Sequence, residues 1–187
     1  MSFAFPSALG PSILVQSSQN YSDEDEQRDI YESQRHHIFS VAYYMTGDER
    51  EAETILGSTF IKGFKEYRKP TVEQLDKALM AELHSRLSFE QVPAMEADAS
   101  GASLGNRNVR RTDLEEALWQ LPEQERLCFL LRDVEGYAPD RIAGLLEVTE
   151  KDIQRTVMSA RIRIRGLILQ QRAANATATA TEAKSEI

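Results

Sequence analysis

Residues 121–165 read LPEQERLCFLLRDVEGYAPDRIAGLLEVTEKDIQRTVMSARIRIR, and this stretch decides the fold of the C-terminal part of the chain. Pro139 suits the first turn of a short helix that continues through Leu146. Thr149 can then cap a long helix that reaches about Gln171. A short helix, a tight turn and a long helix together predict a helix-turn-helix.

The long helix is basic, whereas the whole chain has 30 Asp and Glu residues against 22 Lys and Arg residues. A basic stripe on an acidic chain is typical of a surface that binds a phosphate backbone. Charge alone fits a solvated amphipathic helix equally well, and the preceding short helix and turn favour DNA. The first turns of this helix would meet base edges, while the later arginines would hold phosphate or pack at the helix end. The candidate DNA-binding residues are Lys151, Gln154, Arg155, Thr156, Arg161, Arg163 and Arg165.

The rest of the body also predicts helices. In the N-terminal part, apolar residues recur at helical spacing, Gly47 interrupts the pattern, and Asp48 can cap the helix that follows. A third helix starts at Pro70–Thr71. In the C-terminal part, Asp113 is expected to cap a short helix, and Pro122 opens another that runs to Val134. No alternating segment of useful length argues for a sheet.

We therefore expect an all-α protein with two small helical domains joined by a flexible linker, the C-terminal domain being the helix-turn-helix. Residues 91–111 contain a Gly-, Ala-, Ser- and Asn-rich run without periodicity, which indicates the linker. The expected order is a disordered tail, a helical domain, the linker, the helix-turn-helix domain and a second disordered tail. Their boundaries are 1–25, 26–90, 91–111, 112–172 and 173–187.

Composition narrows the function classes. Cys128 is the only cysteine and sits in an apolar run, so it predicts a buried small side chain, with no disulfide or thiolate cluster. His36, His37 and His84 lack metal-ligand spacing, so we expect no metal and no cofactor. No nucleophile motif or phosphate loop argues for an enzyme. Without a membrane span or an export signal, the protein is expected to be cytoplasmic. Trp119 should lie in the core or between the two units.

Residues 121–165 resemble region 4 of bacterial sigma factors, particularly the small extracytoplasmic-function group of the sigma-70 family. That pattern has an LP dipeptide, an acidic-Gly turn, an "EIA…L" helix and a "TV…AR…LR" helix. The matching residues here are Leu121-Pro122, Gln124, Arg126, Glu135-Gly136, Ile142-Ala143, Leu146, Ile153, Ala160-Arg161 and Arg165. A match spread over about 45 residues is more specific than one short motif.

The N-terminal unit is similar to region 2 of the same family, through Thr46-Gly47-Asp48 and the helix after it. In the family this helix docks on RNA polymerase. The resemblance therefore implies that polymerase would be bound by Glu51, Glu53, Ile55, Leu56 and Phe60. It also implies core RNA polymerase and promoter DNA as partners, with an anti-sigma factor as a further one.

The sequence departs from the family pattern at several positions. Thr54 and Gly57 stand where the docking helix has an Asp and a Gln, and Gly57 costs about 1 kcal/mol of helix stability relative to Ala. Residues 72–87 carry no aromatic and no basic cluster, although single-strand capture needs stacking platforms and a positive groove. Glu147 replaces the turn glycine, which requires a left-handed residue or a reshaped turn. Ser159 replaces a later arginine.

These observations favour a sigma-type transcription initiation factor that binds core polymerase and recognises a promoter through the helix-turn-helix. The alternative is a sigma-like adaptor or regulator that binds polymerase or a protein partner without opening promoters. A third hypothesis keeps only the DNA-binding half, as a helix-turn-helix regulator.

Overall fold

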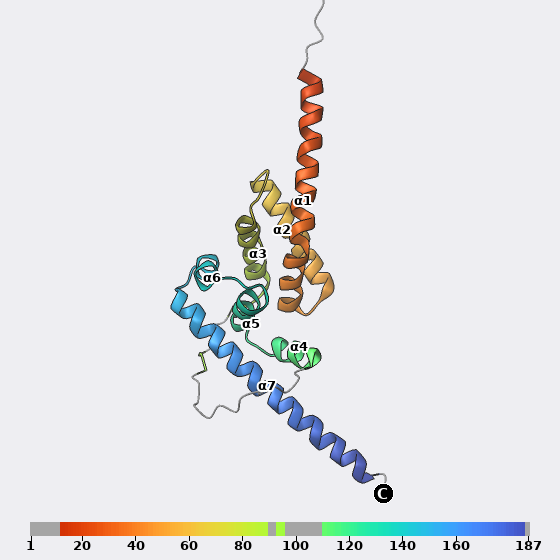
Figure 1. Cartoon of the computed structure of the whole chain (residues 1–187), viewed down its shortest axis with the longest axis vertical. Helices are drawn as coiled ribbons and strands as arrows, with labels where there is room; N and C mark the ends of the chain where they lie inside the picture. Colours follow the sequence, from red (N-terminus) through yellow and green to blue (C-terminus); the bar gives the residue numbers. More distant parts are fainter. Residues whose placement is uncertain (1–11, 90–92, 96–109, 186–187) are drawn as a thin grey trace, which may run out of the picture.

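The computed structural model describes residues 12–89, 93–95 and 110–185, and every regular element within these ranges is a helix (Figure 1). The all-α prediction is therefore confirmed. None of these helices is long and apolar enough to cross a lipid bilayer. The elements are α1 (Ser12–Thr46), α2 (Glu49–Glu66), α3 (Val72–Arg86), α4 (Arg111–Trp119), α5 (Glu123–Phe129), η1 (Leu130–Val134), α6 (Pro139–Leu146) and α7 (Glu150–Ser185).

The boundaries of the N-terminal helices follow from local chemistry. Gly47 ends α1 with a φ of +71°, a conformation that glycine adopts without steric cost. Asp48 then caps α2, as predicted, because its carboxylate accepts a hydrogen bond from the Glu51 amide at 2.9 Å. At the start of α3, Thr71 and Gln74 form a reciprocal capping box.

Two local features of the C-terminal helices differ from the sequence prediction. Arg110, not Asp113, is the N-cap residue of α4, and Asp113 lies one turn further on and is buried. The helix expected from Pro122 to Val134 is α-helical only through Phe129 and continues as the π-helical η1. The Glu135 amide donates to the Leu130 carbonyl at 2.9 Å, which is the i+5 spacing of a π turn. No residue pattern in the sequence predicts the Arg110 cap or the π-helical turn.

Of the disordered tails expected at 1–25 and 173–187, residues 1–11 and 186–187 lie outside the described residues, and the remainder is helical. Residues 12–25 belong to α1 and residues 173–185 to α7. Each segment extends an established helix, so it avoids the cost of nucleation. The C-terminal one is also rich in alanine, the best helix former.

Both helical units expected from the sequence are present, and they pack directly against each other. The main core contains Ile38 and Leu79 from the N-terminal helices together with Leu131 and Ile142 from the C-terminal ones, all at 1% exposure or less. Cys128 is buried in the same core, as predicted, and burial raises the pKa of its thiol to about 12. A second cluster joins α4 to α7 and consists of Ala117, Leu118, Leu121, Ala160, Ile164 and Ile168.

Polar and aromatic contacts also cross between the two units. The Arg126 guanidinium of α5 donates to the Met45 carbonyl at the end of α1 at 2.9 Å. Trp119 of α4 lies edge-on to Tyr43 of α1, with ring centroids 6.4 Å apart, and its indole edge faces Gly47. Its position between the units was one of the two expected from the sequence, although 40% of the residue stays exposed.

Candidate nucleic-acid interface

The turn between α6 and α7 is tight because Glu147 takes the left-handed conformation, with φ of 55° and ψ of 39°. In this conformation the Glu147 amide can donate to the Ala143 carbonyl and so cap α6. The strained alternative expected from the sequence is therefore the one adopted. A left-handed non-glycine residue costs roughly 1–2 kcal/mol, so the turn holds its geometry against a local penalty.

Thr149 caps the start of α7, as predicted. Its hydroxyl oxygen accepts from the Asp152 amide at 3.2 Å, and its hydroxyl donates to the Asp152 carboxylate at 2.6 Å. The hydrogen bond from Thr149 lowers the pKa of the Asp152 carboxyl. Inside the turn, Ile153 and Val157 are buried against the core, so the opposite face of these first turns points away from the protein.

That outward face carries the base-reading candidates. Lys151, Gln154 and Arg155 are exposed, and Thr156 is half-buried beside them. The Gln154 amide donates to the Glu150 carboxylate at 2.9 Å. The structure thus brings the four predicted residues together on the first two turns of the second helix, where a helix-turn-helix meets base edges. Which bases or phosphates they contact remains a prediction.

The three arginines further along α7 are placed differently. Arg161 forms a two-pronged ion pair with Asp133 of η1, with its Nε 2.8 Å from the carboxylate. Arg163 pairs with Glu125 of α5 at 2.9 Å, and Arg165 is half-buried. A guanidinium that already holds a carboxylate must break that pair before it grips phosphate. The sequence left two roles open for Arg161 and Arg163, binding phosphate or packing at the helix end. The structure shows both side chains packed in ion pairs within the protein.

Residues 93–95, a described piece of the expected linker, lie against α7. The Met95 amide donates to the Ser159 hydroxyl at 2.7 Å, and the Arg163 guanidinium donates to the Pro93 carbonyl at 3.1 Å. Ser159 is fully buried and donates in turn to Glu125 at 2.7 Å. The position where the family pattern has an arginine therefore anchors the linker instead. The sequence does not predict this contact, because a single serine belongs to no recognisable motif or periodicity.

The five polymerase-binding candidates lie on α2 but do not share one surface. Ile55 and Phe60 are buried in the core at 0% and 5% exposure, and Glu51 forms an ion pair with Arg86 of α3 at 2.6 Å. Glu53 is exposed and Leu56 is half-buried. A partner that approaches α2 from outside would therefore meet Glu53 and the edge of Leu56, while Ile55 and Phe60 hold the helix in place.

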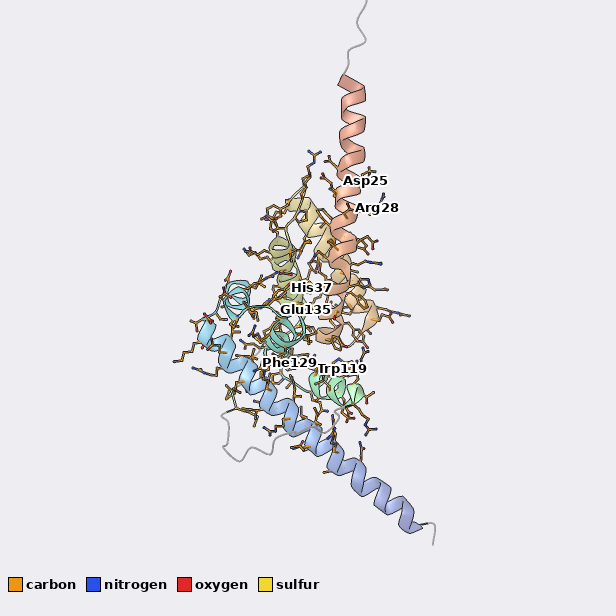
Figure 2. The ribbon with its side chains drawn as sticks, in the orientation of Figure 1. Asp25, Arg28, His37, Trp119, Phe129 and Glu135 are labelled. Atoms are coloured by element: carbon orange, nitrogen blue, oxygen red, sulfur yellow. The ribbon has the colours of Figure 1, made fainter. Side chains whose placement is uncertain are left out.

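Sequence reasoning missed a polar cluster where the two units meet. His37 of α1 lies beside Glu135, which follows η1, near the centre of the molecule (Figure 2). The His37 side chain is only 15% exposed, and both of its ring nitrogens lie within hydrogen-bond distance of a carboxylate. Within the described residues, no group of three or more His, Cys, Asp or Glu is arranged to hold a metal ion.

Comparison with known proteins gives a match to one family and similarity to solved structures, and finds no match among curated proteins. Residues 111–164 match the family described as "Sigma-70, region 4". The fold is similar to that of the sigma factor RpoE from Bartonella quintana, crystallised with the anti-sigma factor NepR. That likeness covers 75% of this chain and 97% of that chain, with a TM-score of 0.57 at 17% sequence identity.

The family match begins at the first residue of α4 and ends on α7, so it contains α6, the turn and the part of α7 that carries the exposed face just described. The structural likeness includes N-terminal helices, because 75% of the chain is longer than the whole stretch from residue 111 to residue 187. Residues 111–164 therefore match a sigma-70 region 4 domain, and the chain shares the overall fold of a solved sigma factor.

Proposed function

We propose that the chain is a sigma-type transcription initiation factor of the extracytoplasmic-function type, which binds core RNA polymerase and places α7 on a promoter −35 element. One observation carries the proposal: the region 4 match covers a helix-turn-helix whose second helix exposes Lys151, Gln154 and Arg155 on its first turns. The mechanism is binding and positioning, so the chain itself catalyses no reaction. Polymerase and genomic DNA as partners place the protein in the cytoplasm.

The polymerase contact is proposed for the outer face of α2. Glu53 is the exposed carboxylate there, with Leu56 beside it, and an acidic helix face complements a basic partner surface. Glu53→Arg should weaken binding to core polymerase without lowering thermal stability, because the side chain is solvent-exposed. Glu116→Arg on α4 carries the same charge change at another exposed site and serves as the control. Equal core binding by both variants would remove α2 from the proposal.

An anti-sigma factor is proposed as a further partner. The similar RpoE structure contains the anti-sigma factor NepR, and this chain shares the fold through its two helical units. Sequence identity of 17% does not specify which protein would bind here. Affinity capture with the full-length chain, with purified core polymerase as competitor, tests whether such a partner competes for the same surface.

The adaptor that binds polymerase without opening promoters is favoured by a separate observation on α3. This helix has no aromatic residue, and its Lys77 and Arg86 are both ion-paired to carboxylates, at 3.0 Å to Glu73 and 2.6 Å to Glu51. Strand capture requires aromatic stacking and free positive charge. The helix therefore lacks the features that would hold a melted strand.

Core pull-down followed by run-off transcription on genomic templates separates the candidates. Core binding with promoter-specific transcripts supports the initiation factor, and core binding without transcripts selects the adaptor. DNA binding without core binding selects the third hypothesis, a helix-turn-helix regulator. Arg155→Ala should weaken specific DNA binding by roughly 1–3 kcal/mol. The control Lys65→Ala removes an exposed charge on α2. Unchanged affinity and salt dependence in the Arg155 variant would contradict the assignment of α7 as the reading helix.

A further inference from the structure

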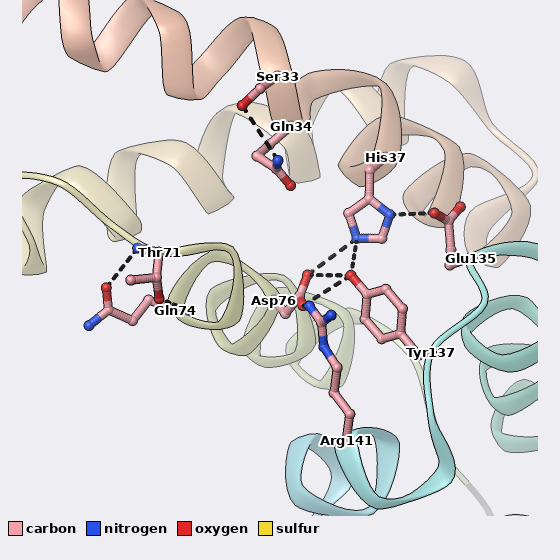
Figure 3. A network of polar contacts seen from close by, with 9 residues as sticks. All are labelled: Ser33, Gln34, His37, Thr71, Gln74, Asp76, Glu135, Tyr137 and Arg141. Carbon is pink, nitrogen blue, oxygen red and sulfur yellow. Dashed lines mark hydrogen bonds and ion pairs between the residues drawn. The ribbon is translucent and has the colours of Figure 1, made fainter.

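Five side chains from both helical units meet in one polar cluster (Figure 3). His37 of α1 and Asp76 of α3 come from the N-terminal unit, whereas Glu135, Tyr137 and Arg141 come from the C-terminal unit, before and within α6. The His37–Asp76 contact lies inside the N-terminal unit, and the other contacts join residues 61 to 100 positions apart across the two units. The apolar core joins the same helices.

Asp76 is the centre of the cluster. Its carboxylate is buried, with 2% of the side chain exposed, and it accepts hydrogen bonds from the Arg141 guanidinium at 2.6 Å and the Tyr137 hydroxyl at 3.1 Å. The Arg141 guanidinium also lies 3.7 Å from the centre of the Tyr137 ring. A buried carboxylate is costly unless it is paired, and both of these partners belong to the other unit. Separating the units would remove them.

His37 lies between two carboxylates. Its Nδ1 is 2.7 Å from Glu135, and its Nε2 is 3.2 Å from Asp76. Only the protonated ring can donate from both nitrogens, because a neutral imidazole has one donor and one acceptor. A neutral ring would turn a lone pair toward a carboxylate oxygen. The Tyr137 hydroxyl, 3.0 Å from Nε2, could then donate to the ring, but only by giving up Asp76. Loss of the proton therefore removes at least one hydrogen bond from the cluster.

The negative charges around His37 also favour its protonated form. Burial lowers the pKa of His37, but the hydrogen bonds and negative charges of Asp76 and Glu135 raise it by more, so it lies above the ordinary 6.5. The groups that face the ring are Asp76 from α3 and Glu135 and Tyr137 from the turn before α6. Arg141 of α6 reaches the ring through its pair with Asp76.

We propose that this cluster is a proton-operated latch that holds the helix-turn-helix closed against the N-terminal helices. A group with a raised pKa in the closed state contributes its stabilisation fully below the pKa of the open state and loses it as the pH rises through the closed-state value. Closure is thus strongest below the ordinary histidine pKa of 6.5 and weakens as the pH rises through the raised pKa of His37. The apolar core holds the two units together at all pH values, and protonation of His37 adds a pH-dependent contribution to the free energy of closure. The inference concerns the chain alone and does not depend on polymerase or DNA binding.

The test follows opening of the isolated full-length chain between pH 6 and pH 9. Trp119 is the only tryptophan and contacts Tyr43 across the two units, so its emission reports on their separation. Small-angle X-ray scattering gives the radius of gyration independently. For the wild type we expect a red shift of the emission and a larger radius as the pH rises. His37→Gln should remove this response and shift the equilibrium toward the open form about tenfold at pH 6, as expected for losing a charge-assisted hydrogen bond.

His36→Gln is the matched control, because its side chain is exposed and one position away. It should behave like the wild type. The proposal is overturned if the wild-type radius does not change with pH, or if both histidine variants keep the wild-type response. Far-UV circular dichroism shows whether His37→Gln is folded. If it is not, an NMR titration of the wild-type ring decides: a pKa at or below the ordinary histidine value overturns the latch, and one above it, accompanied by chemical-shift changes at Tyr137, supports it.

Discussion

Arg126→Met should be among the most destabilising single changes in the chain, because this side chain donates hydrogen bonds to the ends of two helices and to the turn before α5. Its guanidinium donates to the carbonyls of Met45, Trp119 and Leu121 at 2.8–2.9 Å, and the residue is 8% exposed. These carbonyls close α1 and α4 and the turn before α5, where no helical amide satisfies them. Burial lowers the pKa of Arg126, because desolvation disfavours the charged guanidinium.

The size of the expected destabilisation follows from the carbonyl groups that Arg126→Met leaves without a hydrogen-bond donor. Methionine keeps most of the aliphatic volume, so the main loss is three unpaired carbonyls at about 1–1.5 kcal/mol each, or about 3–4.5 kcal/mol. Urea unfolding followed by circular dichroism measures this loss as a change in the free energy of unfolding. Arg132→Met is the matched control, since Arg132 donates one hydrogen bond, to the Tyr137 carbonyl at 2.8 Å, and should lose about 1 kcal/mol. Equal losses in the two variants would refute the argument that three carbonyls depend on Arg126.

Three substitutions test backbone and packing arguments by the same measurement. Glu147→Gly should raise the free energy of unfolding by about 1 kcal/mol, because glycine takes the left-handed conformation freely; no gain would mean that the turn relaxes. Gly57→Ala should also stabilise by about 1 kcal/mol, since a Cβ there has no atom within 4 Å. Gly63→Ala should instead destabilise by about 1–3 kcal/mol, because its Cβ would lie 2.7 Å from a buried leucine side chain of α3. Similar effects of the two alanine variants would contradict the packing of α2 on α3.

Several local features could be predicted from the sequence because neighbouring residues determine them. Asp48 and Thr149 cap their helices as expected, since a cap depends on amides two or three positions away. The left-handed conformation of Glu147 was one of the two outcomes expected where a turn normally requires glycine. Asp113 was assigned wrongly as a cap, because a polar residue near a helix start does not show which turn comes first.

The residues of the candidate interface also differ in whether local sequence could place them. Lys151, Gln154 and Arg155 lie on an exposed face because the helical period alone places them opposite the buried stripe. Arg163 was expected at the same interface but holds Glu125, a residue 38 positions away, and period says nothing about such a partner. Ile55 was named as a polymerase contact from family resemblance, whereas packing of the N-terminal helices buries it completely.

The sequence by itself determined the helices, most of their caps, the helix-turn-helix and the basic face of α7, because spacing and local hydrogen bonding specify these features within a few residues. Only the tertiary structure decided that the two units share a core. It also decided that residues 93–95 lie on α7 and that His37 joins Asp76 and Glu135. These contacts depend on side chains brought together from far apart in the chain, and the free energy of burying them appears only when the helices pack.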